Sequence, residues 1–369
     1  MQYAVLTKCT NLDLLAFTPT IIIGFYTAGN EKLFSANTEH FKQAFPHVDI
    51  LGCSSESNIN DILPHVDHFQ CTYLCLNIKK EAYAVSIIKA GEDTDLYPFP
   101  DNDPAAIIFS TDYSELLDNT LETLNQTEKS PTYIGAIAGS SLDSDHTPSL
   151  FCNGTYYKND AILLWHINQE FYTLSGISLH DFTPVGSVFE VTKTEEDKIV
   201  EVDYKPALDA IEEMTGPLAQ TNIDAFDYPL FIAPKKESGA FHTPLSSIKA
   251  IDRERKTIEI FKKTKARAKF RVGIPLSRAV QEMQLKKFSR FRAENAVALL
   301  FVCIAYKYHW RNFEPLYLMR IAHALKLPFI GLHTFGEIGP LSLDDVTQIQ
   351  NQTVTLAVLS ERKEVKCVF

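Results

Sequence analysis

One sequence pattern occurs three times in the chain. Each copy has an apolar run, a helix-like segment, a second apolar run that contains a glycine, and later a threonine before another strand-like run. The copies begin at Ile21, Ile107 and Leu299, and their glycines lie 31, 28 and 32 residues further on, at Gly52, Gly135 and Gly331. The threonines Thr72, Thr155 and Thr353 follow the glycines after 20, 20 and 22 residues. The shared order and spacing predict an internal repeat.

The repeated pattern constrains the fold and the place of a binding site. A strand, a crossover helix and a returning strand pack as a right-handed parallel unit. The loops after such strands gather at one edge of the sheet, where open α/β sheets bind ligands. We therefore expect an α/β fold with mixed parallel and antiparallel sheets flanked by helices, in two related halves. We also expect Gly52, Gly135 and Gly331 to end their strands, with functional residues in the loops that follow.

The length of 369 residues suits roughly two domains. We predict a first α/β domain over residues 1–200 and a second over residues 201–369. A long insertion, from about His180 to Arg292, separates the second repeat from the third.

Two strand-like runs follow the first repeat, at 69–78 and 82–88. Only three residues connect them. So short a connection predicts an antiparallel hairpin.

Charge and hydropathy exclude several classes of partner. The net charge is −11 and the pI is about 5.5, so the surface repels nucleic-acid phosphates. No apolar run approaches the ~20 residues that a membrane span needs. The start of the chain, Met1–Ala4, lacks the basic and apolar pattern of a signal peptide. We expect a cytoplasmic protein that neither inserts into membranes nor binds nucleic acid.

Short motifs follow the strand-like runs in a fixed order. The third repeat has Gly331–Ile338 and then Asn351–Leu356, the first has Gly52–Ser55, and the second has Cys152–Gly154. In order and spacing these motifs resemble those of the FIST sensory domain proteins, over most of the chain. Further matching segments lie in the insertion, at 184–186, 191–193 and 202–208.

The resemblance implies a FIST N-like domain in residues 1–200 and a FIST C-like domain in residues 201–369. It also implies a small-ligand sensor of bacterial or archaeal signalling, with amino acids as suggested ligands. Family members are often fused to signalling modules. The chain leaves no residues for such a module, so we expect a free-standing sensor that acts through a histidine kinase, a cyclase or a chemoreceptor. Some members bind haem, which leaves a nitric oxide sensor as an alternative.

Two positions depart from the family pattern. The first loop continues with Glu56-Ser57-Asn58-Ile59, where the family has alanine, glycine, glutamate and isoleucine. Its acidic position is therefore Asn58, whereas the counterpart Glu337 is kept. After Cys303 the chain has Ala305-Tyr306 in place of a glycine–arginine pair, which removes a positive charge from the expected pocket. The ligand can therefore differ from the usual ligand of the family.

The predicted ligand site lies where the three glycine loops converge. These loops carry small hydroxyl side chains, one carboxylate and one imidazole, and two aromatic residues could form a wall. Such a mixed set of donors and acceptors suits a zwitterion or a sugar-sized polar ligand. The predicted ligand-binding residues are Cys53, Ser54, Ser55, Ser140, Ser141, Tyr306, His333, Thr334, Phe335 and Glu337.

An enzyme is the other class of function that the sequence leaves open. Cys53 or Ser54 could act as the nucleophile of a hydrolase or an acyl transferase, which would require a neighbouring base and, for the thiol, a lowered pKa. The sequence has no Cys-His-Asn family signature, so we assign no catalytic residue and favour a sensor without enzymatic activity.

Cofactor and metal sites have little support in the sequence. A haem would need an axial histidine in an apolar pocket, and no haem attachment motif is present. Cys71 and Cys75 have no second pair of ligands with which to bind zinc. We expect neither a cofactor nor a metal ion.

Overall fold

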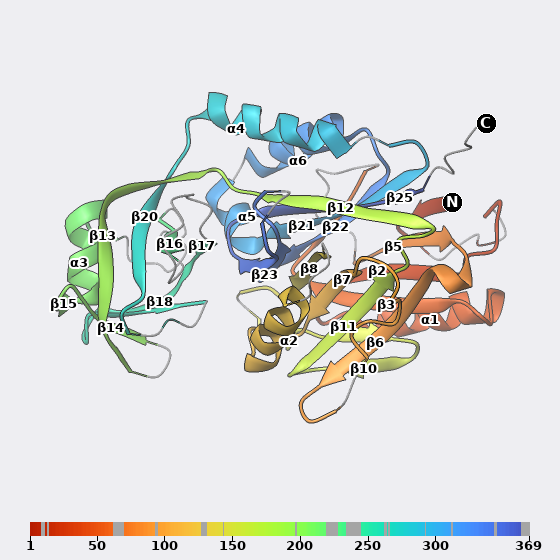
Figure 1. Cartoon of the computed structure of the whole chain (residues 1–369), viewed down its shortest axis with the longest axis horizontal. Helices are drawn as coiled ribbons and strands as arrows, with labels where there is room; N and C mark the ends of the chain where they lie inside the picture. The colour runs from red at the N-terminus through yellow and green to blue at the C-terminus, as the bar shows by residue number, and fades with distance from the viewer. Residues whose placement is uncertain are drawn as a thin grey trace.

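The computed structural model places most of the chain in four β-sheets with helices on their outer sides (Figure 1). It describes residues 1–8, 12, 15–61, 70–92, 95–126, 131–142, 144–195, 198–218, 228–233, 245–261, 264, 266–291, 293–310, 313–342 and 345–362.

Three of the sheets are built on the repeated pattern. In each, the first strand of a unit lies between a parallel second strand and an antiparallel last strand. The predicted strand–helix–strand units and mixed sheets are thus confirmed. The units are β2 (Ile21–Thr27), α1 (Glu31–Ala44), β3 (Asp49–Ser55) and β5 (Cys71–Asn77); β7 (Ala105–Ser110), α2 (Glu115–Asn125), β8 (Thr132–Ile137) and β11 (Ala161–Ile167); and β21 (Ala296–Cys303), α5 (Ile304–Trp310), α6 (Glu314–Leu325), β22 (Phe329–Thr334) and β25 (Val354–Glu361).

Each unit also donates a short strand to the sheet of another unit. The first unit gives β4 (Asn58–Asn60) to β22 of the third, and the third gives β23 (Gly336–Gly339) to β8 of the second. The second gives β9 (Leu150–Cys152) to β3 of the first. The exchange is cyclic and interlocks the three sheets.

Further strands complete the sheets. One edge strand lies beside the last strand of each unit, and two short strands extend the opposite edges. The edge strands are β1 (Gln2–Leu6), β6 (Tyr83–Lys89) and β12 (Tyr172–Leu179), and the short ones are β10 (Thr155–Tyr157) and β24 (Gln348–Gln350).

The predicted hairpin after the first repeat is wrong. Strand β5 pairs with β1 and β2, whereas β6 pairs with β11 in another sheet. A 3₁₀ helix, η2 (Lys80–Ala82), carries the chain from one sheet to the other. Ala82 and Tyr83 are buried in the core between these sheets, so the short connection forms a corner between packed layers.

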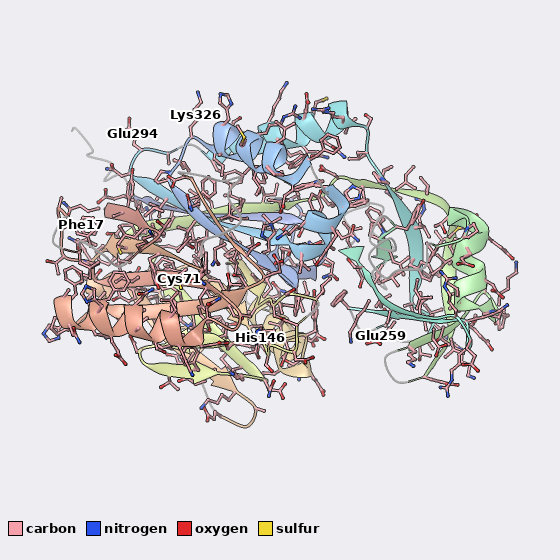
Figure 2. The ribbon with its side chains drawn as sticks, turned by 180° about the vertical axis from the view of Figure 1, so that it is seen from behind. Phe17, Cys71, His146, Glu259, Glu294 and Lys326 are labelled. Atoms are coloured by element: carbon pink, nitrogen blue, oxygen red, sulfur yellow. The ribbon has the colours of Figure 1, made fainter. Side chains whose placement is uncertain are left out.

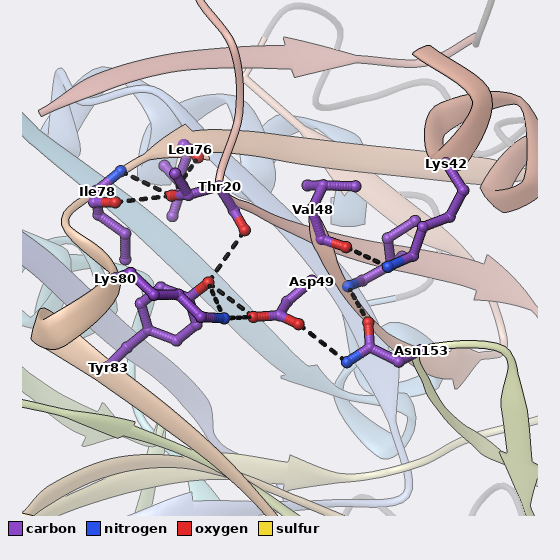
Figure 3. A network of polar contacts seen from close by, with 10 residues as sticks. Thr20, Lys42, Val48, Asp49, Leu76, Ile78, Lys80, Tyr83 and Asn153 are labelled. Atoms are coloured by element: carbon purple, nitrogen blue, oxygen red, sulfur yellow. Dashed lines mark hydrogen bonds and ion pairs between the residues drawn. The ribbon is translucent and has the colours of Figure 1, made fainter. Parts of the chain in front are cut away.

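Asp49 ties this corner to the start of β3 (Figure 3). Its carboxylate accepts hydrogen bonds from Lys80, from the Tyr83 hydroxyl at 2.8 Å and from Asn153 Nδ2 at 3.0 Å. Burial opposes ionisation of Asp49, but these bonds outweigh it and hold the pKa of the carboxyl below its ordinary value. The network joins residues of the first and second units.

The three sheets share one core. Phe25 of β2, Phe109 of β7 and Phe301 of β21 meet edge to face, with ring centroids 6.0, 6.5 and 5.8 Å apart. Aromatic pairs favour this arrangement. Because the inner faces pack on one another and helices cover the outer faces, the central strands are buried on both sides.

The repeated glycines lie inside their strands, so the expectation that they end them is wrong. The strands continue for three, two and three residues beyond Gly52, Gly135 and Gly331. A Cβ on Gly135 would lie 1.7 Å from the carbonyl oxygen of Ile108, and one on Gly331 would lie 2.6 Å from that of Leu300. In these two strands the glycine permits close approach of the neighbouring parallel strand.

The insertion lies between β12 and the third unit, which begins at β21. It forms an eight-stranded antiparallel sheet with its own core, at the left in Figure 1 and around Glu259 in Figure 2. Helix α4 (Arg278–Leu285) and the 3₁₀ helix η4 (Lys286–Phe291) lead back to the third unit. The other elements are β13 (Phe182–Glu195), β14 (Lys198–Val202), β15 (Lys205–Pro206), α3 (Ala207–Thr215), β16 (Leu230–Ala233), β17 (Leu245–Ser246), β18 (Ile248–Asp252), β19 (Thr257–Ile260) and β20 (Lys269–Pro275).

Packing connects the two predicted domains. Strand β12, before residue 200, pairs with β25, after it, and the shared core takes side chains from both parts. A division into family domains at residue 200 stays a prediction. None of the described helices is both long and apolar enough to cross a membrane.

Candidate ligand-binding site

The ends of the three repeated strands meet, as the repeat predicts. Ser54 of β3 exchanges hydrogen bonds with the loop after β8: its Oγ donates to the Gly139 carbonyl at 3.1 Å, and its carbonyl accepts from the Gly139 N–H at 3.0 Å. The Glu56 N–H in turn donates to the His333 carbonyl of β22 at 3.2 Å. The loops of all three units thus converge on one place.

The predicted serines Ser54 and Ser55 help to hold the converging segments together. Ser54 Oγ also accepts the Ser149 N–H at 2.9 Å. Ser55 Oγ lies 3.1 Å from the Tyr26 carbonyl oxygen and 2.7 Å from Asn58 Oδ1. Both serines are fully buried, as is Ser140, whereas Ser141 is half-buried. In this structure the hydroxyls of Ser54 and Ser55 bond to the protein itself.

The two predicted aromatic residues do not form one wall. Tyr306 belongs to α5 and is buried, and its ring centroid lies 4.2 Å from that of Trp310. Phe335 packs beside α2 in a different apolar cluster.

Cys53 points into the core shared by the three sheets. It is fully buried, and this burial raises the pKa of its thiol. A nucleophilic cysteine requires the opposite shift, so the surroundings of Cys53 do not favour catalysis.

Glu337 of β23 lies beneath the converging loops and is fully buried. Its carboxyl oxygens accept hydrogen bonds from Thr334 Oγ1 and, at 2.8 Å, from Thr353 Oγ1. Burial outweighs these bonds and raises the pKa of Glu337 to about 8. The side chain is therefore mostly protonated at neutral pH. Perturbed carboxyls of this kind are typical of functional sites.

Five polar side chains meet where the loop after β3 contacts β22, α5 and α6. We call them the polar junction: Glu56, Ser57, Lys307, Glu314 and His333. Lys307 Nζ donates to Glu56 Oε2 at 2.8 Å and to Ser57 Oγ at 3.2 Å. Ser57 Oγ lies 2.7 Å from both Glu56 Oε2 and His333 Nδ1. His333 Nε2 lies 2.5 Å from Glu314 Oε1.

Solvent reaches the junction from one side. The side chains of Lys307 and Glu56 are 19% and 15% exposed, whereas that of His333 is 2% exposed. His333 Nε2 and Glu314 Oε1 are both buried and face each other, and they form an ion pair when the imidazole is protonated.

Only one residue of the polar junction is among those predicted from the sequence. His333 was among the predicted residues, but the other four were not. Glu56 and Ser57 directly follow the predicted serines, so their place in the loop was a usable signal. Lys307 contacts Glu56 across 251 positions in sequence, and no local pattern marks such a pair.

The histidines and acidic residues give no metal site in the part of the chain that the structure describes, since no group of three or more His, Cys, Asp or Glu could hold an ion. His166, inside β11, has its Nε2 3.1 Å from Ser86 Oγ. Burial lowers the pKa of His166 to about 4, so its imidazole is neutral.

A comparison with known protein families shows the family to which the chain belongs. The sequence profile of the FIST N domain matches residues 20–205, which is half of the chain. The chain belongs to the FIST family. FIST domains are small-ligand sensory domains of signal transduction. The match contains the first two repeated units, including Gly52–Ser55 and Cys152–Gly154. The likeness of residues 201–369 to a FIST C domain stays a prediction. A comparison with curated proteins finds no match.

Proposed function

We propose that this FIST protein senses a small polar metabolite, such as an amino acid, that binds at the polar junction. The gathering of two carboxylates, a lysine and a histidine at a partly exposed place supports this proposal most. A polar ligand that bound there would meet hydrogen-bond donors and acceptors of both charges.

The charges of the junction suit a zwitterion. Lys307 can pair with a carboxylate, and Glu56 and Glu314 can pair with an ammonium group. The family's expected glycine–arginine pair is replaced by Ala305-Tyr306, but Lys307 brings a positive charge next to that position. In the proposed complex the ligand exchanges the internal ion pairs for pairs with itself.

The position of the junction offers a route to a signal. Glu56 and Ser57 directly precede β4, which pairs with β22 of the third unit, and Lys307 lies on α5, which follows β21. A ligand that binds these residues alters the contact between the first and third units. We propose that this change is passed to a separate histidine kinase, cyclase or chemoreceptor.

The proposal is tested by a thermal-shift screen with amino acids, related polar metabolites and haem. A ligand at one hundred times its dissociation constant adds about 2.7 kcal/mol to the free energy of unfolding. For a protein of this size the melting temperature should rise by a few degrees. Lys307→Met and Glu314→Gln should each reduce the shift. Lys32→Met, at an exposed position on α1, should leave it unchanged.

Four results would contradict the proposal. The wild type could show no shift with any compound, or the shift could persist undiminished in both junction variants. Haem could be the only hit, with a Soret band that disappears when a histidine is replaced, which would favour the gas-sensor alternative. Turnover of ester, thioester or amide substrates that Cys53→Ala abolishes would instead identify an enzyme.

A further inference from the structure

Exposed apolar side chains gather on α4, α6 and the residue before α6. Of the twelve large apolar side chains exposed in the described part of the chain, five lie here. Met283 and Phe313 are 65% and 66% exposed. The five residues are Val280, Met283, Phe313, Leu316 and Met319. Three of them, Phe313, Leu316 and Met319, line the cavities described next, and exposed apolar residues that gather in this way mark an interaction site more often than scattered residues do.

Two adjoining cavities lie beside these three residues. One has a volume of about 300 Å³ and is lined by Trp310, Phe313 and Tyr317 among others. The second has a volume of about 470 Å³ and is lined by Leu285 and Met319 among others. Leu316 and Arg320 line both. We call this continuous depression the α4–α6 groove; both helices lie along the upper edge of the molecule in Figure 1.

The rim of the groove is basic although the chain as a whole is acidic. Arg278, Lys286 and Arg320 line the two cavities, and Glu282 is their one carboxylate. Glu282 Oε1 lies 2.7 Å from Arg320 and 3.7 Å from Arg278, so its single charge is shared by two cations. The rim therefore keeps a net positive charge on a chain of net charge −11.

The length of the groove fits a helix. The stretch from Phe313, just before α6, to Ala324 within it is about 16 Å long, at 1.5 Å per residue. This distance matches about three turns of a second helix, whose apolar anchors at every third or fourth position would enter the two cavities. The buried Trp310, Tyr317 and Leu285 form the apolar floor on which such anchors would pack.

We propose that the α4–α6 groove binds an acidic amphipathic helix of a partner protein. Apolar anchors fill the two cavities, and carboxylates on the flanks of the helix pair with Arg278, Lys286 and Arg320. A second copy of the chain fits less well, because a twofold interface would bring the two basic rims together. An anionic membrane fits less well too, because the surface is concave and the chain is acidic. The inference stands independently of the ligand proposed above.

The test measures binding of a fluorescent peptide of about 16 residues, with leucine at every third or fourth position and glutamate on the opposite face. The groove should bind it, and added salt should weaken binding. Leu316→Glu and Met319→Glu should each weaken binding by about tenfold or more. Arg278→Glu should weaken it as well. Val346→Glu, at an exposed apolar position outside the groove, should have no effect. Thermal melting of every variant verifies its fold.

The inference is overturned if the acidic peptide does not bind, if a peptide with lysine in place of glutamate binds equally well, or if the groove variants bind like the wild type. Sedimentation velocity and flotation with phosphatidylserine vesicles examine the other occupants. Self-association or vesicle binding that Leu316→Glu abolishes would assign the groove to a second copy or to a membrane, and would also overturn the inference.

Discussion

Glu337 is a carboxyl group that its surroundings keep neutral. Burial raises its pKa to about 8, and the hydroxyls of Thr334 and Thr353 only partly offset this effect. The native state therefore keeps a proton that the unfolded chain releases at a pH near the ordinary carboxyl value of 4.5. The protonated side chain bonds to Thr334 at the end of β22 and to Thr353 just before β25.

The raised pKa predicts how stability changes with pH. Between pH 4.5 and about 8 the native state binds more protons at Glu337 than the unfolded state, so stability falls as pH rises. The slope reaches about 1.4 kcal/mol per pH unit. Glu337→Gln cannot ionise and should lack this contribution. Urea unfolding across this range should show the variant gaining stability relative to wild type as pH rises.

An unchanged difference between Glu337→Gln and wild type across the same range would contradict the raised pKa. It would show that Glu337 ionises in the folded protein as it does in the unfolded chain.

Some of the site residues could be predicted from the sequence, whereas their contacts could not. His333 lies near the end of the recognisable strand β22 and Glu337 follows shortly after it, so their place near the strand end could be predicted. The burial of the Glu337 carboxyl and its hydrogen bonds to Thr334 and Thr353 could not be predicted. Thr353 reaches the carboxyl only when β25 packs beside β21. The partners of His333 and Glu56 on α5 and α6 depend on tertiary packing in the same way.

Among the elements, the repeated strands and helices were predictable because each unit has strong local periodicity. The strands exchanged between units were not. β4, β9 and β23 have only three or four residues each, too few for a periodic signal. The wrong hairpin prediction at η2 has a similar cause. Three connecting residues suit both a hairpin and a turn between two sheets, and only the strands that pair with β5 and β6 distinguish the two.

The Asp49 network makes a prediction about that corner. Asp49→Asn keeps the size of the side chain but removes the charge that Lys80, Tyr83 and Asn153 bond to, so it should cost about 1–3 kcal/mol at neutral pH. Because the pKa of Asp49 is lowered in the folded state, its contribution is present above the ordinary carboxyl pKa, about 4, and is lost as pH falls below it.

Unfolding experiments at neutral and acid pH check this dependence. The difference between Asp49→Asn and wild type should shrink in acid, whereas Asp101→Asn, at an exposed position, should show little difference at either pH. A cost for Asp49→Asn that stays the same in acid would mean that the charge does not hold the corner.

The whole molecule is three related units around one aromatic centre, with an insertion before the third. Phe25, Phe109 and Phe301 come from different units and the exchanged strands cross between them, so the units share a central core, although each also packs its helices on the outer face of its own sheet. We therefore expect a change at one contact between units to reach the others. This coupling makes the junction of the first and third units a suitable place for a sensor to convert ligand binding into a change of shape.

Hydrogen exchange measured with and without the ligand found in the thermal screen tests this account most directly. Ligand binding should slow amide exchange in three segments together: residues 56–60, α5 and β22. These segments belong to two different units. Lys307→Met should remove the protection, and β18 and β19 of the insertion should exchange as before. Protection confined to the insertion or to the α4–α6 groove, with no change in the three segments, would contradict it.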